Sequence, residues 1–594
     1  MVKIRVADYI AKFIETRLGV DKVFLITGGG NMHLTDGVLK NKNITHICNH
    51  HEQASAMSAI GYAKQTGKPG VVMPTTGCAG TNTITGLLDA WQDSLPCFFI
   101  SGQVNTAQTC RKSPAKLRKF GVQEVDIIEV VKPLTKYAEM VENPEDIRYH
   151  LEKAFSIATE GRPGPVWIDV PLDVQGRLIE EESLKGFTPL TPLNKTPLNF
   201  NLDFLKDSKR PIILAGNGIR LSGAEKTFRK FTRELNIPVV STFLALDLLD
   251  GDDNLFTGRV GVKGDRAGNF AMQNADLILA VGTSLNVPVT GYNYNTFGRE
   301  AKLVVVDVDP DEHMKDTVSI DKFIKADAGE FLSYILDNIS DDFKGDTEWS
   351  DQCETWKNSW SLDPKVKDQS IVDLYHFTKC LSKALPENSS VIGDAGSAFY
   401  VPSQILKLKE GQKWITSGAQ GEMGFTLPAA IGAQIGSPET TVAAITGDGS
   451  FQFNIQELQT IKHYNLPIKL FVWNNNGYLS IRKTQEKFFD GDYIGTSLDS
   501  GISFPNLKKI AYAYDIPYLL IENNGECEEG IRKCLKGVGP IICEVMCDET
   551  QKILPTLSSQ KQPDGTIIGR PLEDMDPLLP RDEFYNNMKV KPIS

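Results

Sequence analysis

A chain of 594 residues is too long for one hydrophobic core, so about three or four domains are expected. The apolar fraction of 41% and the charged fraction of 23% are those of a soluble globular protein, and the net charge of −12 argues against nucleic acid or an anionic membrane as the main partner. Ten scattered cysteines without a CxxC pair, no signal-peptide apolar region and no membrane-spanning apolar run predict a cytoplasmic protein with reduced thiols.

Residues 1–186 alternate short apolar strands with helical stretches, and several of the strands end in glycine-rich turns. Such turns before helices indicate a doubly wound parallel sheet whose ligands bind at the turns. The strands expected here are 23–26, 70–73, 97–100 and 166–171.

A second alternation of strands and helices is expected at 200–345, between two linkers. The first linker (187–203) contains Pro and Asn, and the second (341–363) is acidic with Trp and Ser. The third domain is expected at 365–560, and the polar tail 561–594 is expected to pack over the surface or to act as a lid. The predicted fold class is therefore α/β, with three doubly wound parallel-sheet domains. The strands expected in the second domain lie within 210–218, 239–242, 277–282 and 303–308.

The most informative segment lies in the third domain. An apolar strand, 442–445, runs into Gly447-Asp448-Gly449-Ser450, and a second apolar strand, 468–473, ends in three asparagines. Both ends are expected at the carboxyl edge of one parallel sheet, where α/β proteins bind ligands. Asp448 and Asn475 offer a carboxylate and an amide oxygen, which suit Mg²⁺ that completes its shell with diphosphate oxygens and water. An ordinary strand-helix-strand unit with a glycine-rich turn is the alternative.

This pattern, a Gly-Asp-Gly followed after some two dozen residues by Asn-Asn, resembles the thiamine diphosphate (ThDP) signature. Over nearly its whole length, the chain is similar to ThDP-dependent enzymes of the acetolactate synthase and pyruvate oxidase group. The resemblance implies ThDP and Mg²⁺ as cofactors, with Asp448, Asn475 and Gly477 at the metal. It implies a first domain that binds the aminopyrimidine, a central Rossmann-like domain, and a third domain that binds the diphosphate. It also implies a homodimer or homotetramer with active sites between subunits.

A second motif, His50-His51-Glu52-Gln53, resembles the His-Glu-Gln box of this group. The resemblance places the Glu52 carboxylate against the aminopyrimidine ring nitrogen. Protonation of that ring favours the imino tautomer, whose nitrogen removes the thiazolium C2 proton within the cofactor. The alternative is a solvated glutamate in the first turn of a helix.

The segment 416–430 resembles the part of the family that holds the middle of the cofactor. There, Met423 would wedge between the two rings, and the Gly421 carbonyl would accept from the aminopyrimidine amine. Glu422 replaces an expected small residue and is a candidate substrate contact. The turn Gly396-Ser397-Ala398 would meet the diphosphate through backbone N–H groups and Ser397. The other cofactor contacts implied by the resemblance are Gly29, Gly30, Thr76, Asn82, Gly447, Gly449, Ser450, Tyr478 and Leu479.

Candidate substrate contacts are Gly30, Gln123 and Lys136, of which Gln123 also parallels a glutamine that reaches the partner subunit's active site and is a candidate catalytic residue. A solvated role for Lys136 is equally expected. Ser480 and Thr484 stand where acetolactate synthases usually have Met and Trp. The sequence therefore predicts a more open, polar pocket that suits a hydroxylated acceptor.

Two further features depart from acetolactate synthases. Arg482 and Lys483 would add positive charge to the pocket, or else they are solvated helix residues. The arginine pattern of the flavin-binding members is missing from the middle domain, so FAD is in doubt. An empty middle domain, or one adapted to a nucleotide-bearing ligand, is at least as strongly expected.

The favoured function is a ThDP- and Mg²⁺-dependent 2-keto acid decarboxylase and carboligase. It would pass the ThDP-bound carbanion to an acceptor carbonyl, for which a sugar-like compound is one candidate. Its partners would be a small-molecule 2-keto acid and a carbonyl acceptor. The alternative is a ThDP-dependent C–C lyase or hydrolase that acts on a hydroxylated diketone. A catalytically dead regulator is disfavoured because Glu52, Asp448 and Asn475 are all present.

Overall fold

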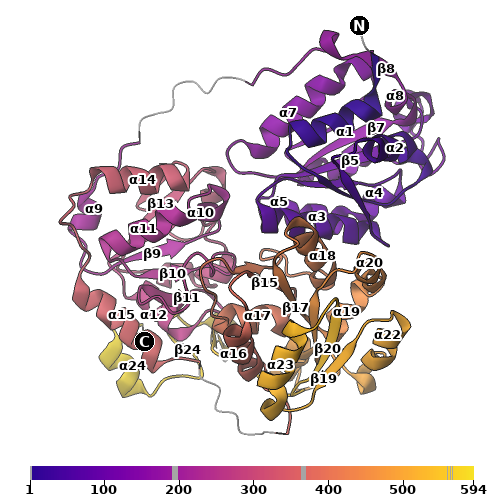
Figure 1. The fold of residues 1–594 in the computed structure, drawn as a ribbon. Coiled ribbons are helices and arrows are strands. Elements are labelled where there is room, and N and C mark those ends of the chain that lie inside the picture. The colour runs from indigo at the N-terminus through magenta and orange to yellow at the C-terminus, as the bar shows by residue number, and fades with distance from the viewer. Residues whose placement is uncertain are drawn as a thin grey trace.

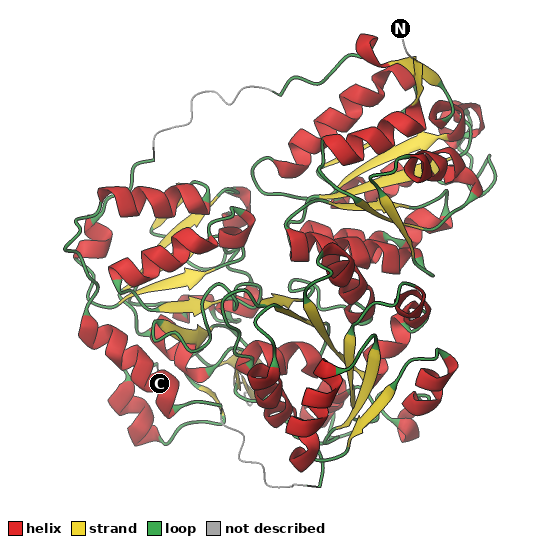
Figure 2. Cartoon of the chain, in the orientation of Figure 1, coloured by secondary structure: helices red, strands yellow, loops and turns green. Residues whose placement is uncertain are grey.

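The computed structural model describes residues 3–189, 198–362, 370–557, 559–561, 564 and 566–593, which form three α/β domains (Figure 1). Each domain contains a six-stranded sheet with parallel neighbours, and helices flank each sheet (Figure 2). The predicted fold class is confirmed. The exact domain limits stay a prediction.

The N-terminal sheet has the strand order β3-β2-β4-β5-β7-β6. Its central strands are continuously apolar and buried, as expected for a parallel sheet that is covered on both faces. A short antiparallel pair, β1 (Lys3–Arg5) with β8 (Leu178–Glu180), ties the two ends of the domain together. The strands of the sheet are β2 (Lys22–Leu25), β3 (Thr45–Cys48), β4 (Gly70–Met73), β5 (Cys97–Gln103), β6 (Tyr137–Met140) and β7 (Val166–Pro171). The helices are α1 (Val6–Thr16), α2 (Met32–Lys40), α3 (Glu52–Thr66), α4 (Cys78–Asn82), α5 (Ile84–Gln92), α6 (Ile127–Val131), α7 (Ile147–Thr159) and α8 (Leu172–Gln175).

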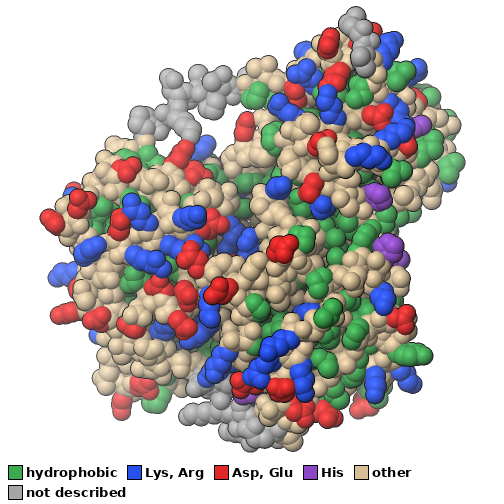
Figure 3. Space-filling view, in the orientation of Figure 1, with side chains coloured by type: hydrophobic (Ala, Val, Ile, Leu, Met, Phe, Trp, Pro, Cys, Tyr) green, Lys and Arg blue, Asp and Glu red, His purple; other side chains and the backbone are tan. Residues whose placement is uncertain are grey.

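The central sheet has the strand order β11-β10-β9-β12-β13-β14. Its strands are β9 (Pro211–Ala215), β10 (Val239–Ser241), β11 (Phe256–Arg259), β12 (Leu277–Val281), β13 (Lys302–Asp307) and β14 (Lys322–Lys325). The helices are α9 (Asp203–Lys206), α10 (Gly218–Leu221), α11 (Glu225–Leu235), α12 (Arg266–Gln273), α13 (Val287–Thr290), α14 (Ala328–Asn338) and α15 (Thr347–Ser359). On the face shown in Figure 3, acidic and basic side chains are interspersed over this domain.

The C-terminal sheet has the strand order β16-β15-β17-β18-β20-β19, so the two strands of the predicted signature, β17 and β18, are neighbours. Its strands are β15 (Ser389–Gly393), β16 (Lys413–Ile415), β17 (Thr441–Gly447), β18 (Lys469–Asn474), β19 (Tyr518–Ile521) and β20 (Ile541–Met546). The helices are α16 (Leu374–Ala384), α17 (Ser397–Ile405), α18 (Thr426–Gly436), α19 (Asp448–Phe451), α20 (Glu457–His463), α21 (Leu479–Phe488), α22 (Leu507–Ala513) and α23 (Cys527–Lys536).

The N-terminal and C-terminal domains meet where α3 packs directly on α18 (Figure 1). A Cβ on Gly61 would lie 2.2 Å from the Ala429 carbonyl oxygen, and one on Gly432 would lie 1.8 Å from the Ser58 carbonyl oxygen. Only glycine at these two positions permits such close backbone approach. Because α3 begins at Glu52 and α18 begins shortly after Met423, this packing fixes two candidate site segments against each other.

The second expected linker is wrong over most of its length. Residues 347–359 form α15, whose buried face carries Trp349, Cys353 and Trp356. The acidic composition concealed this apolar spacing of three and four residues, which is typical of a helix that packs on a core. Of the first expected linker, residues 190–197 lie outside the described residues.

The tail packs against the central domain. The helix α24 (Arg581–Asn587) buries Phe584 against Phe270, and the buried carboxylate of Glu573 pairs with Arg299 at 2.7 Å. Three short strands, β21 (Thr556–Leu557), β22 (Ser559–Lys561) and β23 (Ile567–Gly569), and a fourth, β24 (Met575–Asp576), precede α24. Among the described residues, no helix is both long and apolar enough to span a membrane.

Candidate functional site

Three neighbouring strands of the C-terminal domain end at one edge of its sheet. Asp394 joins the turns after β15 and β17. It follows β15, and its buried carboxylate accepts hydrogen bonds from Thr446 and Ser450 at the end of β17. Burial raises the pKa of Asp394. The sequence motifs suggested no role for Asp394, although it directly bonds to the candidate Ser450 and closely precedes the candidate Gly396.

Asp448 joins the next two turns. Its Oδ1 accepts from the Gly449 N–H at 2.8 Å, and its Oδ2 accepts from the Gly477 N–H at 3.1 Å. Burial raises the pKa of Asp448 to about 7 despite these donors. Asn475 is also buried, with 2% exposed area. A divalent cation would favour the ionised carboxylate, so this pair of oxygen donors fits Mg²⁺.

The turn after β15 provides room and donors for a phosphate group. Gly396 has φ +57°, which places it in the left-handed region, and it caps the start of α17. Ser397 and Ala398 are buried in the first turn of that helix. The N–H groups of a helix N-terminus are unpaired and favour anions, so this turn suits a diphosphate.

At the N-terminal domain, Glu52 begins α3 and is half-buried. Its Oε2 accepts from Asn82 Nδ2 at 3.0 Å, which brings two predicted cofactor residues together. The start of α3 is fixed from the other domain, because Glu457 of α20 accepts from the His50 N–H at 2.9 Å. Asn82 therefore holds the Glu52 carboxylate, and Glu457 holds the backbone that precedes α3.

Gly29, Gly30 and Thr76 lie at the ends of the neighbouring strands β2 and β4. The Gly30 N–H donates to Thr75 Oγ1 at 3.1 Å. A Cβ on Gly30 would overlap the Thr76 hydroxyl, whereas one on Gly29 would meet no atom within 4 Å. The structure thus brings these three predicted contacts to one edge of the sheet.

Gln123 is exposed on a loop that crosses the start of α4. Its backbone has φ +59°, an unusual conformation for a residue other than glycine. A Cβ on Gly77 would lie 1.9 Å from the Gln123 carbonyl oxygen. Buried Glu124 holds the loop by accepting from the Cys110 N–H at 2.9 Å. Since α4 also carries Asn82, the loop lies near the Glu52 pair.

The segment that carries Met423 contacts the N-terminal domain and the glycine turn of its own domain. Asp93 of the N-terminal domain accepts from the N–H groups of Gly418 and Ala419, at 3.0 and 2.9 Å. The Gly424 N–H donates to Ser450 Oγ at 2.8 Å. Met423 therefore lies beside the Gly447–Ser450 turn of the same chain.

The comparisons with known proteins agree with this geometry. Residues 4–129 match the model of the thiamine pyrophosphate enzyme N-terminal TPP binding domain. Residues 198–335 match the central domain of the same enzymes, and residues 394–545 match their C-terminal TPP binding domain. Thiamine pyrophosphate is another name for ThDP. The chain belongs to the thiamine pyrophosphate enzyme family.

Relatives extend this similarity over most of the chain. It is 32% identical over 570 residues to the chloroplastic acetolactate synthase of Arabidopsis thaliana, covering 93% of this chain and 83% of that protein. It is also 32% identical over 542 residues to the acetolactate synthase isozyme 2 large subunit of Escherichia coli (strain K12), covering 90% and 94%. The protein is thus a ThDP-dependent enzyme similar to acetolactate synthases, as the sequence predicted.

Within this ThDP enzyme, the segment after Asn475 differs from its predicted arrangement. The Ser480 hydroxyl is buried and would lie 3.1 Å from a Cβ on Gly396, so Ser480 faces the diphosphate turn. Thr484 is exposed and donates to the Ser480 carbonyl. Arg482 is buried against Asn475, and Lys483 pairs with Glu486 at 2.8 Å. Arg482 is therefore neither a pocket charge nor a solvated helix residue, while the charge of the partly exposed Lys483 is offset by Glu486.

Tyr478 and Leu479 have different surroundings. The Tyr478 ring packs on Gly449, where a Cβ would lie 2.2 Å from it. Leu479 is 3% exposed and belongs to the hydrophobic core of the C-terminal domain. A side-chain contact from Leu479 to the cofactor is therefore disfavoured, while its backbone stays a candidate.

The side chain of Lys136 bonds to backbone carbonyls of its own domain. Its Nζ donates to the carbonyls of Glu160 and Arg162, each at 2.7 Å. Burial lowers the pKa of this lysine. It joins the start of β6 to the loop before β7, and its role as a substrate contact stays a prediction.

Lys64, Asp89 and Asp93 were missed by sequence reasoning, and they face Glu422. Lys64 Nζ lies 2.6 Å from Asp93 and 3.8 Å from Asp89, both on the N-terminal domain. The carboxylate oxygens of Glu422 are buried, and burial raises the pKa of Glu422 to about 7. Burial also raises the pKa of Asp89 well above its ordinary value. The sequence separates these residues widely, so no spacing could reveal the cluster.

Proposed function

We propose that this ThDP enzyme is an Mg²⁺-dependent 2-keto acid decarboxylase and carboligase whose acceptor is a hydroxylated, sugar-like carbonyl compound. The observation that carries the proposal is the buried Asp448, which joins the glycine turn after β17 to the asparagine turn after β18. The Glu52–Asn82 pair in the N-terminal domain supports it.

The roles proposed for the chain's own residues combine this geometry with the resemblance to the family. Asp448 and the Asn475 amide, with the Gly477 carbonyl, would hold the metal, and the first turn of α17 would bind a phosphate group. Gly421 and Met423 would hold the middle of the cofactor, and Glu52 would hold a proton at the aminopyrimidine ring. ThDP, when bound, supplies the carbanion chemistry.

The choice of acceptor is proposed from the polar segment after Asn475. Ser480 and Thr484 replace bulky apolar residues, and a site with polar groups disfavours partners that leave these groups unpaired. We therefore expect poor synthesis of acetolactate and acetohydroxybutyrate from pyruvate, relative to transfer onto a sugar-like or phosphorylated acceptor.

The test supplies purified protein with ThDP, Mg²⁺ and pyruvate, with and without sugar-type aldehydes and ketones, and measures CO₂ and carboligation products. We expect an added acceptor to raise CO₂ release. Acetolactate formation at an ordinary enzymatic turnover, on the order of ten per second, would overturn the acceptor assignment. Cleavage of a hydroxylated diketone without any 2-keto acid turnover would favour the lyase or hydrolase instead.

The site is proposed to be completed by a second copy of the chain. Exposed apolar side chains flank the candidate residues: Met32 follows Gly30, and Phe120 and Val122 precede Gln123, with exposed fractions of 49%, 56% and 77%. Such side chains are typical of a surface that another protein covers. We expect a homodimer or homotetramer, measured by sedimentation at assay concentration, and an active monomer would contradict this expectation.

The cleft between the central and N-terminal domains does not suit FAD. Its volume is about 1460 Å³. Arg162, one of its basic residues, pairs with Asp309 and Glu312. The other basic residues of the lining, Lys322 and Lys325, lie on the edge strand β14. Because the lining contains more carboxylates than cations, a dinucleotide diphosphate would meet net negative charge. We therefore assign FAD no role.

The compartment is proposed from the cysteines. All ten are free, and five of the buried ones lie in the C-terminal and central domains. Free thiols are typical of a reducing compartment, so we propose the cytoplasm.

A further inference from the structure

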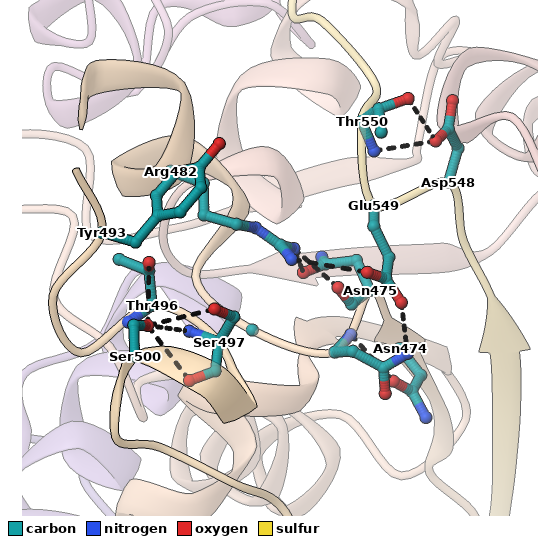
Figure 4. Close-up of polar contacts among 12 residues, drawn as sticks. Asn474, Asn475, Arg482, Tyr493, Thr496, Ser497, Ser500, Asp548, Glu549 and Thr550 are labelled. Carbon is teal, nitrogen blue, oxygen red and sulfur yellow. Dashed lines mark hydrogen bonds and ion pairs between the residues drawn. The ribbon is translucent and has the colours of Figure 1, made fainter. Parts of the chain in front are cut away.

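Arg482 lies directly behind the proposed metal turn. It comes from the first half of α21, and its side chain is 8% exposed. Nη2 donates to the Asn475 carbonyl at 2.6 Å and lies 3.3 Å from Asn475 Oδ1 (Figure 4). One guanidinium nitrogen therefore contacts both the backbone and the side chain of a residue that the proposed function places at the metal.

The remaining contacts of Arg482 are weaker. Nη1 lies 3.6 Å from Glu549, a half-exposed residue of the loop after β20. Glu549 also accepts from Asn476 Nδ2 at 2.5 Å. Solvent screens the exposed ion pair with Glu549. The contacts with Asn475 therefore compensate most of the cost of burying the guanidinium.

The same helix braces the metal turn on its other side. Gln485 lies one helical turn after Arg482, and its side chain bonds to both backbone groups of Ile494, at 3.1 and 3.3 Å. This fixes the loop segment up to Thr496, whose carbonyl accepts from the Tyr478 N–H at 3.0 Å. A Cβ on Gly477 would lie 2.0 Å from that carbonyl oxygen and 3.6 Å from the Arg482 guanidinium carbon. The turn 475–478 is thus enclosed between Arg482 and Thr496.

We propose that Arg482 is a positioning residue that fixes the orientation of Asn475 and so makes the site selective for Mg²⁺. The proposal rests on the proposed metal role of Asp448 and Asn475. Mg²⁺ requires nearly ideal octahedral geometry, whereas Ca²⁺ accepts irregular ligand sets. Groups that orient a metal ligand typically change metal affinity by 10–100-fold when they are removed. Both contacts come from Nη2, which the rigid, planar guanidinium holds in place, whereas the ammonium of lysine is carried on a flexible stem.

The test measures ThDP binding through quenching of tryptophan fluorescence while Mg²⁺ or Ca²⁺ is titrated. For Arg482→Lys, the Mg²⁺ concentration at half-saturation should rise on the order of tenfold, and the Ca²⁺ concentration should rise much less. Two controls should stay within about twofold of the wild type for both metals. Lys483→Met changes the neighbouring, partly exposed cation, and Glu549→Gln removes only the exposed ion pair.

An Mg²⁺ requirement within about twofold of the wild type for Arg482→Lys would overturn the proposal. Equal losses for Mg²⁺ and Ca²⁺ would overturn it as well, because they would indicate a general loss of structure or charge. Thermal unfolding without metal checks that each variant is folded. If wild-type protein binds ThDP equally well with EDTA, the metal assignment itself fails. If wild-type protein requires Mg²⁺ and Arg482→Lys has the same requirement, only the role of Arg482 fails.

Wild-type protein provides a second test that does not depend on the folding of a variant. Hydrogen exchange at the amides of residues 475–485 should slow when Mg²⁺ and ThDP bind, because the turn and the start of α21 are joined through Arg482. Unchanged exchange in the first turn of α21, while ThDP binds, would contradict the proposal.

Discussion

Replacing Asp448 by alanine is expected to abolish ThDP binding and activity together. The substitution removes the carboxylate that we assign to the metal, and it also removes the acceptor that joins the Gly449 and Gly477 N–H groups. We expect the affinity for ThDP to fall on the order of a hundredfold or more, since even an outer-shell group costs up to that amount. Calorimetric titration of ThDP in Mg²⁺ and in EDTA measures the loss.

Asp548→Ala is the matched control. Asp548 follows β20 at the same edge of the sheet, and its carboxylate bonds only to Thr550 in the contacts of the described residues. This variant should bind ThDP normally. If Asp448→Ala binds ThDP in Mg²⁺ with the affinity of the wild type, the metal lies elsewhere.

The Glu52→Gln variant is expected to bind ThDP but to catalyse the reaction slowly. The neutral amide keeps the size of the side chain and its contact with Asn82, but it cannot supply a proton to the aminopyrimidine ring. Exchange of the cofactor's C2 proton should slow on the order of a hundredfold or more, as for a removed acid–base group. Acid-quenched NMR measures this rate.

Glu181→Gln serves as the control, because Glu181 pairs with Lys12 at the surface of the same domain. Its C2 exchange should equal that of the wild type. Near-normal exchange in Glu52→Gln would show that Glu52 does not face the aminopyrimidine.

Several parts of the site that the sequence predicted lie at the ends of strands. Asp448 and Asn475 follow β17 and β18, and two apolar runs with their polar ends were enough to place them at one edge. The same reasoning located Gly30 and Thr76 on the neighbouring strands β2 and β4. This reasoning holds because parallel strands bring their carboxyl ends to the same edge of the sheet, independently of the helices that connect them.

The parts that the sequence could not predict depend on the direction of side chains. Arg482 follows the signature closely, yet only the three-dimensional course of α21 shows that it faces Asn475 rather than the pocket. Lys64 and Glu422 meet because α3 packs on the segment before α18, a contact between residues far apart in the chain. Composition also misled: the acidic residues around Trp349 concealed a core helix.

The tail that packs on the central domain has a consequence for how the chain is made. The hydrophobic core around Phe270 and Trp356 also includes Leu572 and Phe584, which follow the C-terminal domain in the sequence. Domains generally fold in order as the ribosome delivers them. The middle domain, however, cannot complete its core until residues 572–584 have been synthesised. The domain that is second in the chain is therefore finished after the third.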